Sequence, residues 1–260
     1  MSNDELLIER NRAVATITLN RPDKRNALTF EMYEGIAAFC REAADDKDLR
    51  VIVISGAGGK AFAAGTDISL FRDFDGAKDG VNYENMIEST LRDIESCPKP
   101  IIAAISGACT GGGAAIAGLC DIRIATQDMV FGFPIARTLG NCLSAASLQR
   151  MSSVLGPART RELIFTSRLI EAEEALAIGL VSEILPDLDA LQARTAELAE
   201  QVCGYAPITL QVTKELFRRI GKACPQVEDE DLIAYCYGSN DFREGLDAFL
   251  TKRKANWTGS

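Results

Sequence analysis

The chain has 260 residues, a length that supports one large buried core with a smaller appended element. Its formal charge of −9 argues against a broad nucleic-acid surface, which needs clustered Lys and Arg, although a few local cations can still hold a small anion. The chain contains no histidine, so a Ser-His-Asp triad, a Cys-His pair and a His-ligated metal are excluded. Any general acid or base must therefore be Asp, Glu, Tyr, Cys, Lys or a bound water.

Cysteine spacing and apolar runs indicate a protein of the cytoplasm. The eight cysteines stand singly, with no CxxC pair, which favours reduced thiols over a zinc cage or a disulfide framework. No apolar run reaches the length that spans a bilayer, and the acidic start MSNDELLIER differs from a signal peptide. We therefore expect a cytoplasmic protein with no membrane partner and no bound metal.

The N-terminal segments alternate predicted strands and helices. Residues 5–10 and 13–19 are predicted strands, and the second alternates its residues with a period of two. Thr29 is a suitable N-cap for a helix over residues 30–45. The apolar run VIVIS at 51–55 is typical of a buried parallel strand.

The same order repeats along the middle of the chain. The pattern predicts a helix over 84–95, a second buried strand over 100–106, a short helix over 114–119, and strands over 121–126 and 129–133. Strands, glycine loops and helices in this order predict an α/β protein built from βα units with a largely parallel sheet. From residue 144 onward the apolar residues recur at helical spacing, which predicts a helical C-terminal part.

Glycine-rich loops follow both buried strands. VIVIS is followed by GAGGKAFAAGTD, and PIIAAIS is followed by GACTGGGAA. Loops at the carboxyl ends of parallel strands line the crevice where ligands bind. Small residues let a ligand approach the main chain, and two such loops could each offer one N–H to a carbonyl oxygen, as in an oxyanion hole. The alternative is that the glycines only permit tight packing of helix on strand.

Segments spread along nearly the whole chain resemble one known family. They are LNRPDKRNALT (19–29), KAFAAGTDI (60–68), ISGACTGGGAAIAGLCDIRIAT (105–126), FGFP (131–134), LGPARTRELIFTSRLIEAEEALAIGLVSEI (155–184) and FLTKRKANWTG (249–259). Together they resemble the enoyl-CoA hydratase/isomerase (crotonase) superfamily. The resemblance implies a crotonase-like spiral of ββα units that binds acyl-CoA over residues 1–200. It also implies a helical region over 201–260 for trimerisation and pocket closure.

The resemblance further implies a site and its ligand. The ligand would be an acyl-CoA, with coenzyme A as part of the substrate and no tightly bound cofactor, and the assembly a homotrimer or a dimer of trimers. The thioester oxygen would accept from the backbone N–H groups of Thr66 and Gly112. Coenzyme A would lie along Lys24, Ala27, Lys60, Ala61, Ala63, Asp67 and Ile68, with Phe249 and Lys252 reaching it from the C-terminal helix. Each lysine taken alone is more typical of a solvated surface charge, and Asp67 is more typical of a residue that stabilises its loop or contacts coenzyme A than of a base.

The positions of the family's catalytic glutamates are occupied differently here. Ala115 lies two residues after the glycine triplet, and Ile135 directly follows FGFP. Loss of one general acid or base typically costs about 100- to 10,000-fold in rate, so hydration by a glutamate pair is not expected. We expect an enzyme that forms an enolate-like intermediate with other acid–base groups. The alternative, which the missing glutamates favour, is a non-catalytic acyl-CoA binder or a partner in a multi-enzyme assembly.

Several residues are candidates for the missing chemistry. Cys142 or Ser144 stands roughly where some relatives carry an aspartate. A thiol at 142 is reactive only if its pKa is lowered, and is otherwise a small buried side chain. Arg137 either pairs with a substrate carboxylate or is a surface charge. Acid candidates in the preceding polar segment, among which the sequence does not choose, are Asp73, Asp75, Tyr83 and Glu84.

Overall fold

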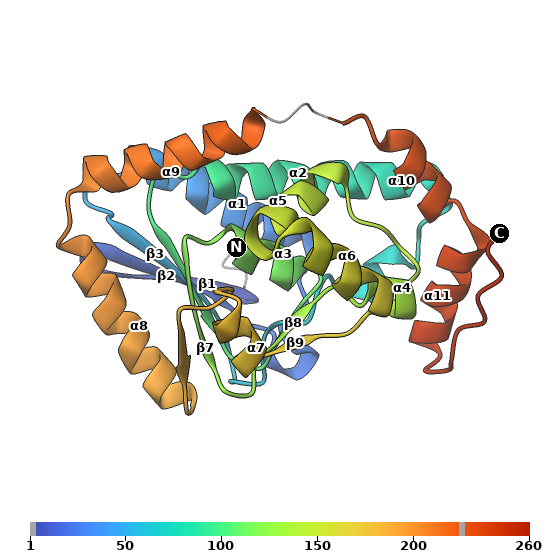
Figure 1. The fold of residues 1–260 in the computed structure, drawn as a ribbon, viewed down its shortest axis with the longest axis horizontal. Coiled ribbons are helices and arrows are strands. Elements are labelled where there is room, and N and C mark those ends of the chain that lie inside the picture. Colours follow the sequence, from blue (N-terminus) through green and yellow to red (C-terminus); the bar gives the residue numbers. More distant parts are fainter. Residues whose placement is uncertain (1–3, 224–226) are drawn as a thin grey trace.

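A larger sheet runs through the computed structural model, which describes residues 4–223 and 227–260 (Figure 1). Its strands stand in the order β1-β2-β3-β5-β7-β10. They span β1 Leu6–Asn11, β2 Val14–Leu19, β3 Val51–Gly56, β5 Ile101–Ile105, β7 Ile122–Thr126 and β10 Glu183–Leu185. β1 pairs antiparallel with β2, as a hairpin requires, and the remaining neighbours pair parallel. The predicted strands of this sheet are confirmed, whereas β10 lies in the part of the chain that was predicted to be helical.

A smaller sheet includes two strands, β4 and β6, that lie within the segments predicted as glycine loops. Its strands, in the order β4-β6-β8-β9, are β4 Ala61–Ala63, β6 Ala108–Thr110, β8 Val130–Gly132 and β9 Ile170–Glu171. The prediction of plain loops at β4 and β6 was wrong, because strands this short show no period that a sequence pattern could reveal. The strands β3, β5 and β7 are each followed by a short strand and then a helix, which confirms the spiral of ββα units.

The helices that precede residue 178 lie mostly on one face of the larger sheet (Figure 1). They are α1 Phe30–Asp45, α2 Ala77–Ser96, α3 Gly112–Leu119, α4 Ile135–Thr138, α5 Ala145–Leu155, α6 Pro157–Thr166 and α7 Ala172–Ala177, with short 3₁₀ turns at η1 Pro22–Lys24 and η2 Ile68–Phe71. Helix α1 begins where predicted, and the Thr29 hydroxyl accepts from the Met32 N–H. Helix α2 begins at Ala77, earlier than the predicted start at residue 84. The prediction missed the first turns because they are polar and carry no apolar stripe.

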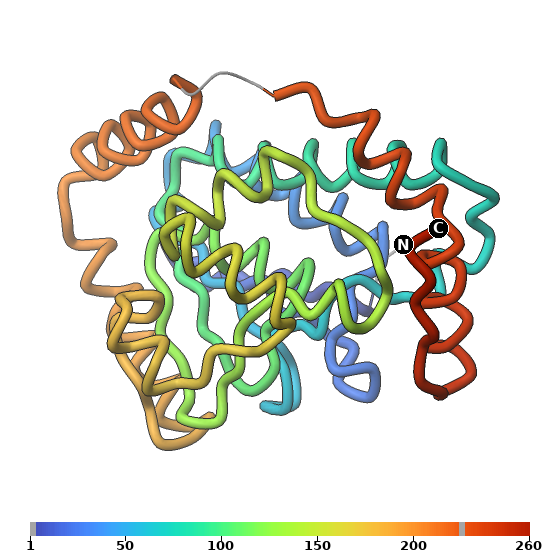
Figure 2. Tube along the Cα trace, turned by 45° about the vertical axis from the view of Figure 1, so that its right-hand side comes forward, coloured from blue at the N-terminus to red at the C-terminus, as the bar shows by residue number. Residues whose placement is uncertain are grey.

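The C-terminal part is helical, as predicted. It consists of α8 Leu188–Cys203, α9 Pro207–Lys222, α10 Glu230–Tyr237 and α11 Asn240–Leu250. Both views place α8 and α9 toward one end of the molecule and α10 and α11 toward the other (Figures 1 and 2). Leu191 and Ala199 of α8 pack on the outer face of the larger sheet, so the predicted division at residues 200 and 201 falls inside a helix that belongs to the core. In the described part of the chain, no helix combines the length and the apolar character needed to cross a bilayer.

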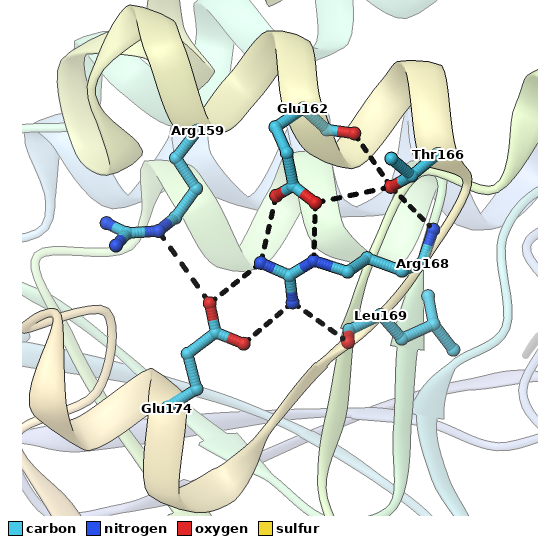
Figure 3. Close-up of polar contacts among 6 residues, drawn as sticks. All are labelled: Arg159, Glu162, Thr166, Arg168, Leu169 and Glu174. Carbon is cyan, nitrogen blue, oxygen red and sulfur yellow. Dashed lines mark hydrogen bonds and ion pairs between the residues drawn. The ribbon is translucent and has the colours of Figure 1, made fainter.

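A surface network of ion pairs joins α6 to the segment around α7 (Figure 3). The Arg168 guanidinium donates to both oxygens of Glu162 and to both oxygens of Glu174, at 2.7–2.9 Å. Arg159 adds a longer pair with Glu174 at 3.7 Å. Bidentate pairs of this kind fix geometry more than they add stability at a partly exposed site. The network therefore positions α6 against α7. Its carboxylates already accept hydrogen bonds from Arg168.

Candidate active site

The glycine loops after β3 and β5 lie against each other. A Cβ atom built on Gly111 would stand 3.4 Å from the Cα atom of Gly65. The first loop is held by Leu28, whose N–H donates to the Gly65 carbonyl at 2.8 Å and whose carbonyl accepts from the Asp67 N–H at 2.9 Å. The Gly111 N–H donates to the carbonyl of Gly132 at 3.0 Å. Both loops are therefore fixed by main-chain bonds on either side of their contact.

The predicted N–H donors line one cavity. Thr66 and Gly112 both face a cavity of about 110 Å³ between the glycine loops and α2. Gly112 is the first residue of α3, where the N–H groups have no partner inside the helix, and Gly111 turns the chain there with a φ of 54° that favours glycine. Among the described residues, neither the Thr66 N–H nor the Gly112 N–H donates to another group of the protein. Their role as donors to a ligand oxygen stays a prediction.

A chain of hydroxyl groups connects the first donor loop to α1 and α2. The Tyr33 hydroxyl bonds to Oγ1 of Thr66 at 2.9 Å, and the same Oγ1 bonds to the Tyr83 hydroxyl at 2.7 Å. A Cβ atom on Gly112 would stand only 1.9 Å from the Tyr33 hydroxyl oxygen, so this position accepts only glycine as the side chains now lie. Burial raises the pKa of Tyr33 and of Tyr83, so both stay neutral phenols. Sequence reasoning missed Tyr33, which is indistinguishable from an ordinary core aromatic in its helix.

The positions of the missing glutamates form an apolar wall of this cavity. Ala115, in the second turn of α3, is 7% exposed and lines the cavity together with Ile135 at the start of α4. Ile87, Leu139 and Leu143 extend the same lining. No carboxylate approaches from α3 or α4 at this wall, because neither described helix carries an acidic residue.

Glu84 brings a carboxyl group to the cavity from another direction. It is 5% exposed on α2, and it is the sole acidic side chain among the described residues that line the cavity. The Tyr237 hydroxyl donates to its Oε1 at 2.7 Å, and the Ser144 N–H donates to the carboxylate as well. Burial outweighs these bonds and raises the pKa of Glu84 to about 7. Such a group exists in both protonation states near neutral pH.

Sequence comparison places the chain in a known family. A family model described as enoyl-CoA hydratase/isomerase matches residues 9–260. The chain belongs to the enoyl-CoA hydratase/isomerase family. It is 31% identical to the short-chain-enoyl-CoA hydratase of Clostridium acetobutylicum, covering 98% of this chain and 97% of that protein. It is 36% identical to the mitochondrial Δ(3,5)-Δ(2,4)-dienoyl-CoA isomerase of Rattus norvegicus, covering 77% of this chain and 64% of that protein.

Solved structures confirm the crotonase fold of this family member. A methylmalonyl-CoA decarboxylase complexed with 2S-carboxypropyl-CoA superposes with a TM-score of 0.89, at 29% identity and with the whole of both chains covered. An enoyl-CoA hydratase/carnithine racemase from Magnetospirillum magneticum superposes with a TM-score of 0.81, at 35% identity, covering 100% of this chain and 97% of that one. The protein is thus an acyl-CoA-processing enzyme at the level of the family.

Tyr83 lines the cavity as a neutral phenol, whereas the other acid–base candidates lie away from it. Asp73 and Asp75 are exposed and do not line it. The hydroxyl of Ser144 accepts from the Ser147 N–H at 3.1 Å and so caps α5. The Cys142 thiol contacts the thiol of Cys236, and this contact together with burial raises the pKa of Cys142, which leaves no thiolate there at neutral pH. A catalytic role for Cys142 stays a prediction.

Arg137 and the residues predicted to contact coenzyme A range from fully buried to exposed. Arg137 is exposed on α4 and does not line the cavity, so its pairing with a substrate carboxylate stays a prediction. The Asp67 carboxylate pairs with Arg21 at 2.9 Å and accepts from the Ser69 N–H at 3.1 Å, which stabilises the first glycine loop. The remaining members of the set are Ala61 and Ala63, both fully buried in β4, the partly buried Ala27 and Ile68, the half-exposed Phe249, and the exposed Lys24, Lys60 and Lys252. Their contact with coenzyme A stays a prediction.

Asn26 ties the polar loop before α1 to the first glycine loop. Its side chain is fully buried, accepts from the Arg21 N–H at 2.9 Å, and donates to the carbonyls of Ala57 and Ala61 at 3.0 and 2.7 Å. Asn26→Ala leaves these buried groups without a partner and is expected to lower the free energy of unfolding by about 3 kcal/mol. Urea denaturation checks this, with the exposed Asn82→Ala on α2 as control. Equal stability of the two variants would contradict the role of Asn26.

Proposed function

We propose that this family member forms an enolate of an acyl-CoA thioester and moves a proton next to the thioester carbonyl. The thioester oxygen accepts from the N–H groups of Thr66 and Gly112, where negative charge develops on it. Fixed donors lower the barrier most when charge appears at the atom they face. The observation that carries the proposal is that both free donors line one cavity, whose wall holds Ala115 and Ile135 in place of carboxylates.

Proton transfer fits this cavity better than hydration does. Hydration requires groups that orient a water molecule and move its protons, and the apolar wall offers none at positions 115 and 135. The names of the relatives include a hydratase, an isomerase and a decarboxylase, so family membership alone does not identify the reaction. The chemistry of the cavity wall favours enolisation, as in isomerisation of a double bond.

Deuterium exchange tests the proposal directly. The purified protein is incubated in heavy water with saturated and unsaturated acyl-CoAs, and mass spectrometry follows both deuterium uptake next to the thioester and hydration of the double bond. Uptake without hydration is the expected result. Fast hydration of a short enoyl-CoA would overturn the proposal. Tight binding of every thioester with no change in any of them would instead favour a non-catalytic acyl-CoA binder.

We also propose that α9 packs against another copy of this chain in a trimer. Its exposed apolar side chains are 50–72% accessible and follow one stripe, consisting of Ile208, Val212, Leu216, Phe217 and Ile220. A stripe of this kind is costly to leave in water, and the resemblance to the family implies a trimer or a pair of trimers. Leu216→Glu combined with Phe217→Glu is expected to give monomers in analytical ultracentrifugation. Gln211→Glu, on the same helix, is the control and should leave the assembly unchanged.

A further inference from the structure

We propose that Glu84 is the acid–base residue of this site. Its carboxylate takes the proton from the carbon next to the thioester carbonyl, so that the C–H bond breaks and an O–H bond forms on Glu84. The electron pair moves to the thioester oxygen, which the two N–H groups hold as an enolate. The carboxyl group then returns the proton to that carbon or to a conjugated one. The assignment rests on the proposed function and adds the residue that moves the proton.

The placement of Glu84 suits this role. Its side chain lines the same cavity as Thr66 and Gly112, and it arrives from α2, whereas Ala115 and Ile135 belong to α3 and α4. The family's usual carboxylates would approach from those two helices. A carboxylate on α2 therefore reaches the acyl portion of a bound thioester from a different wall of the cavity.

Hydrogen bonds orient the carboxylate without neutralising it. Tyr237 donates to Oε1 of Glu84 at 2.7 Å, and the Tyr237 oxygen in turn accepts from Nδ2 of Asn141 at 3.3 Å. The Ser144 N–H, at the start of α5, donates to the carboxylate as well. These bonds hold the carboxylate from α10 and from the loop before α5. A proton acceptor fixed in this way needs no rearrangement before reaction.

The charged groups around Glu84 are chiefly acidic. Asp229 and Glu88 face it, and both disfavour its ionised form. The nearby cation of α5, Arg150, is bidentate with Glu88 at 2.7 and 2.8 Å and contacts Glu95 at 3.3 Å, so it serves other carboxylates. The phenols of Tyr83 and Tyr237 stay neutral, because burial raises the pKa of each. Burial without a cation is what brings the pKa of Glu84 to about 7, near the value best suited to a general base at neutral pH.

A purely structural role for Glu84 has different consequences. Through Tyr237 and Ser144 the carboxylate also links α2 to α10 and to α5, so a tether is the competing explanation. Loss of a tether lowers stability and thioester affinity together with the rate. It has no reason to change the pH at which the remaining activity is half-maximal.

Glu84→Gln separates these explanations, because glutamine keeps the shape but takes no proton. We expect deuterium exchange of a saturated acyl-CoA to fall by about 100- to 10,000-fold. The affinity for the same acyl-CoA in calorimetry is expected to stay within about three-fold, a change of less than 0.7 kcal/mol. Glu88→Gln, one turn further along α2, is the control and should keep the wild-type plateau rate.

The pH profile provides a second test. A base must be ionised to accept a proton, so the wild-type exchange rate is expected to rise with pH, with a midpoint near 7, and to level off above it. Tyr237 donates to the ionised form of Glu84, so Tyr237→Phe removes a bond that lowers this pKa and should move the midpoint to higher pH. The plateau above the new midpoint is expected to fall below that of the wild type, because the carboxylate loses one of the bonds that orient it.

The outcomes distinguish this inference from the proposed function. Wild-type exchange by Glu84→Gln would overturn the role of Glu84 and leave the enolate mechanism standing. Absence of exchange in the wild-type protein would overturn both. If Glu84→Gln does not fold, the pH profile of Tyr237→Phe tests the role of Glu84 instead. A midpoint of the exchange rate unchanged from that of the wild type would then overturn this role.

Discussion

Gly112→Ala is expected to lower the rate of deuterium exchange by about 100- to 1,000-fold, the usual effect of losing one oxyanion donor. The added Cβ atom would stand 1.9 Å from the Tyr33 hydroxyl oxygen, so either the start of α3 or the tyrosine must move. Because that hydroxyl bonds to the side chain of Thr66, a shift of Tyr33 disturbs both donors at once. The rate is measured with the same saturated acyl-CoA in heavy water, and calorimetry reports the affinity.

A second substitution tests the steric cause. Tyr33→Phe removes the oxygen that blocks the new Cβ atom, and the next atoms are Cζ of residue 33 at 3.1 Å and Cδ1 of Leu28 at 3.3 Å. These contacts are tight but can be relieved by shifts of a few tenths of an ångström. The double variant is therefore expected to regain at least about ten-fold of the rate that Gly112→Ala loses. No recovery would show that contact with the hydroxyl is not the cause of the loss.

The parts of the fold that the sequence predicts are those whose residues are buried on a regular pattern. VIVIS and PIIAAIS are apolar on both faces because parallel strands lie between layers, and they became β3 and β5. Thr29 has the hydroxyl that an N-cap needs, and α1 begins after it. β4 and β6 were not predicted because three residues are too few to establish the two-residue period of a strand. Their strand geometry depends on pairing with each other, which is a tertiary interaction.

In the candidate site, too, features that depend on nearby residues are predictable from the sequence, and features that depend on distant residues are not. The glycines of both donor loops are recognisable because Gly65 and Gly111 have a positive φ and because Tyr33 closely approaches Gly112, which favours glycine at all three positions. Glu84 was one of several acid candidates in a polar segment, and its sequence neighbours do not distinguish it. Its environment comes from Tyr237, which lies 153 residues further along the chain. Only the packing of α10 on α2 brings them together, and no pattern within either segment encodes that contact.

Restoring the family's carboxylates should change the reaction rather than only its rate. Ala115→Glu combined with Ile135→Glu places acidic side chains at the apolar wall, where they can orient a water molecule and move its protons. We expect hydration of a short enoyl-CoA to rise by about 100-fold or more over the wild type. The loss of absorbance from the conjugated thioester measures it. The assay is run at about pH 8, because burial raises the pKa of carboxylates that lack a cation.

The matched glutamine variant decides whether acid–base chemistry is responsible. Ala115→Gln combined with Ile135→Gln fills the cavity of about 110 Å³ to the same extent but cannot transfer protons. Equal hydration by the glutamate and glutamine variants would mean that the added volume or polarity, not the carboxylates, admits water to the substrate. Hydration by the glutamate variant alone would show that the donor loops are competent for both reactions. The side chains at positions 115 and 135 would then determine whether the bound thioester gains water or only exchanges a proton.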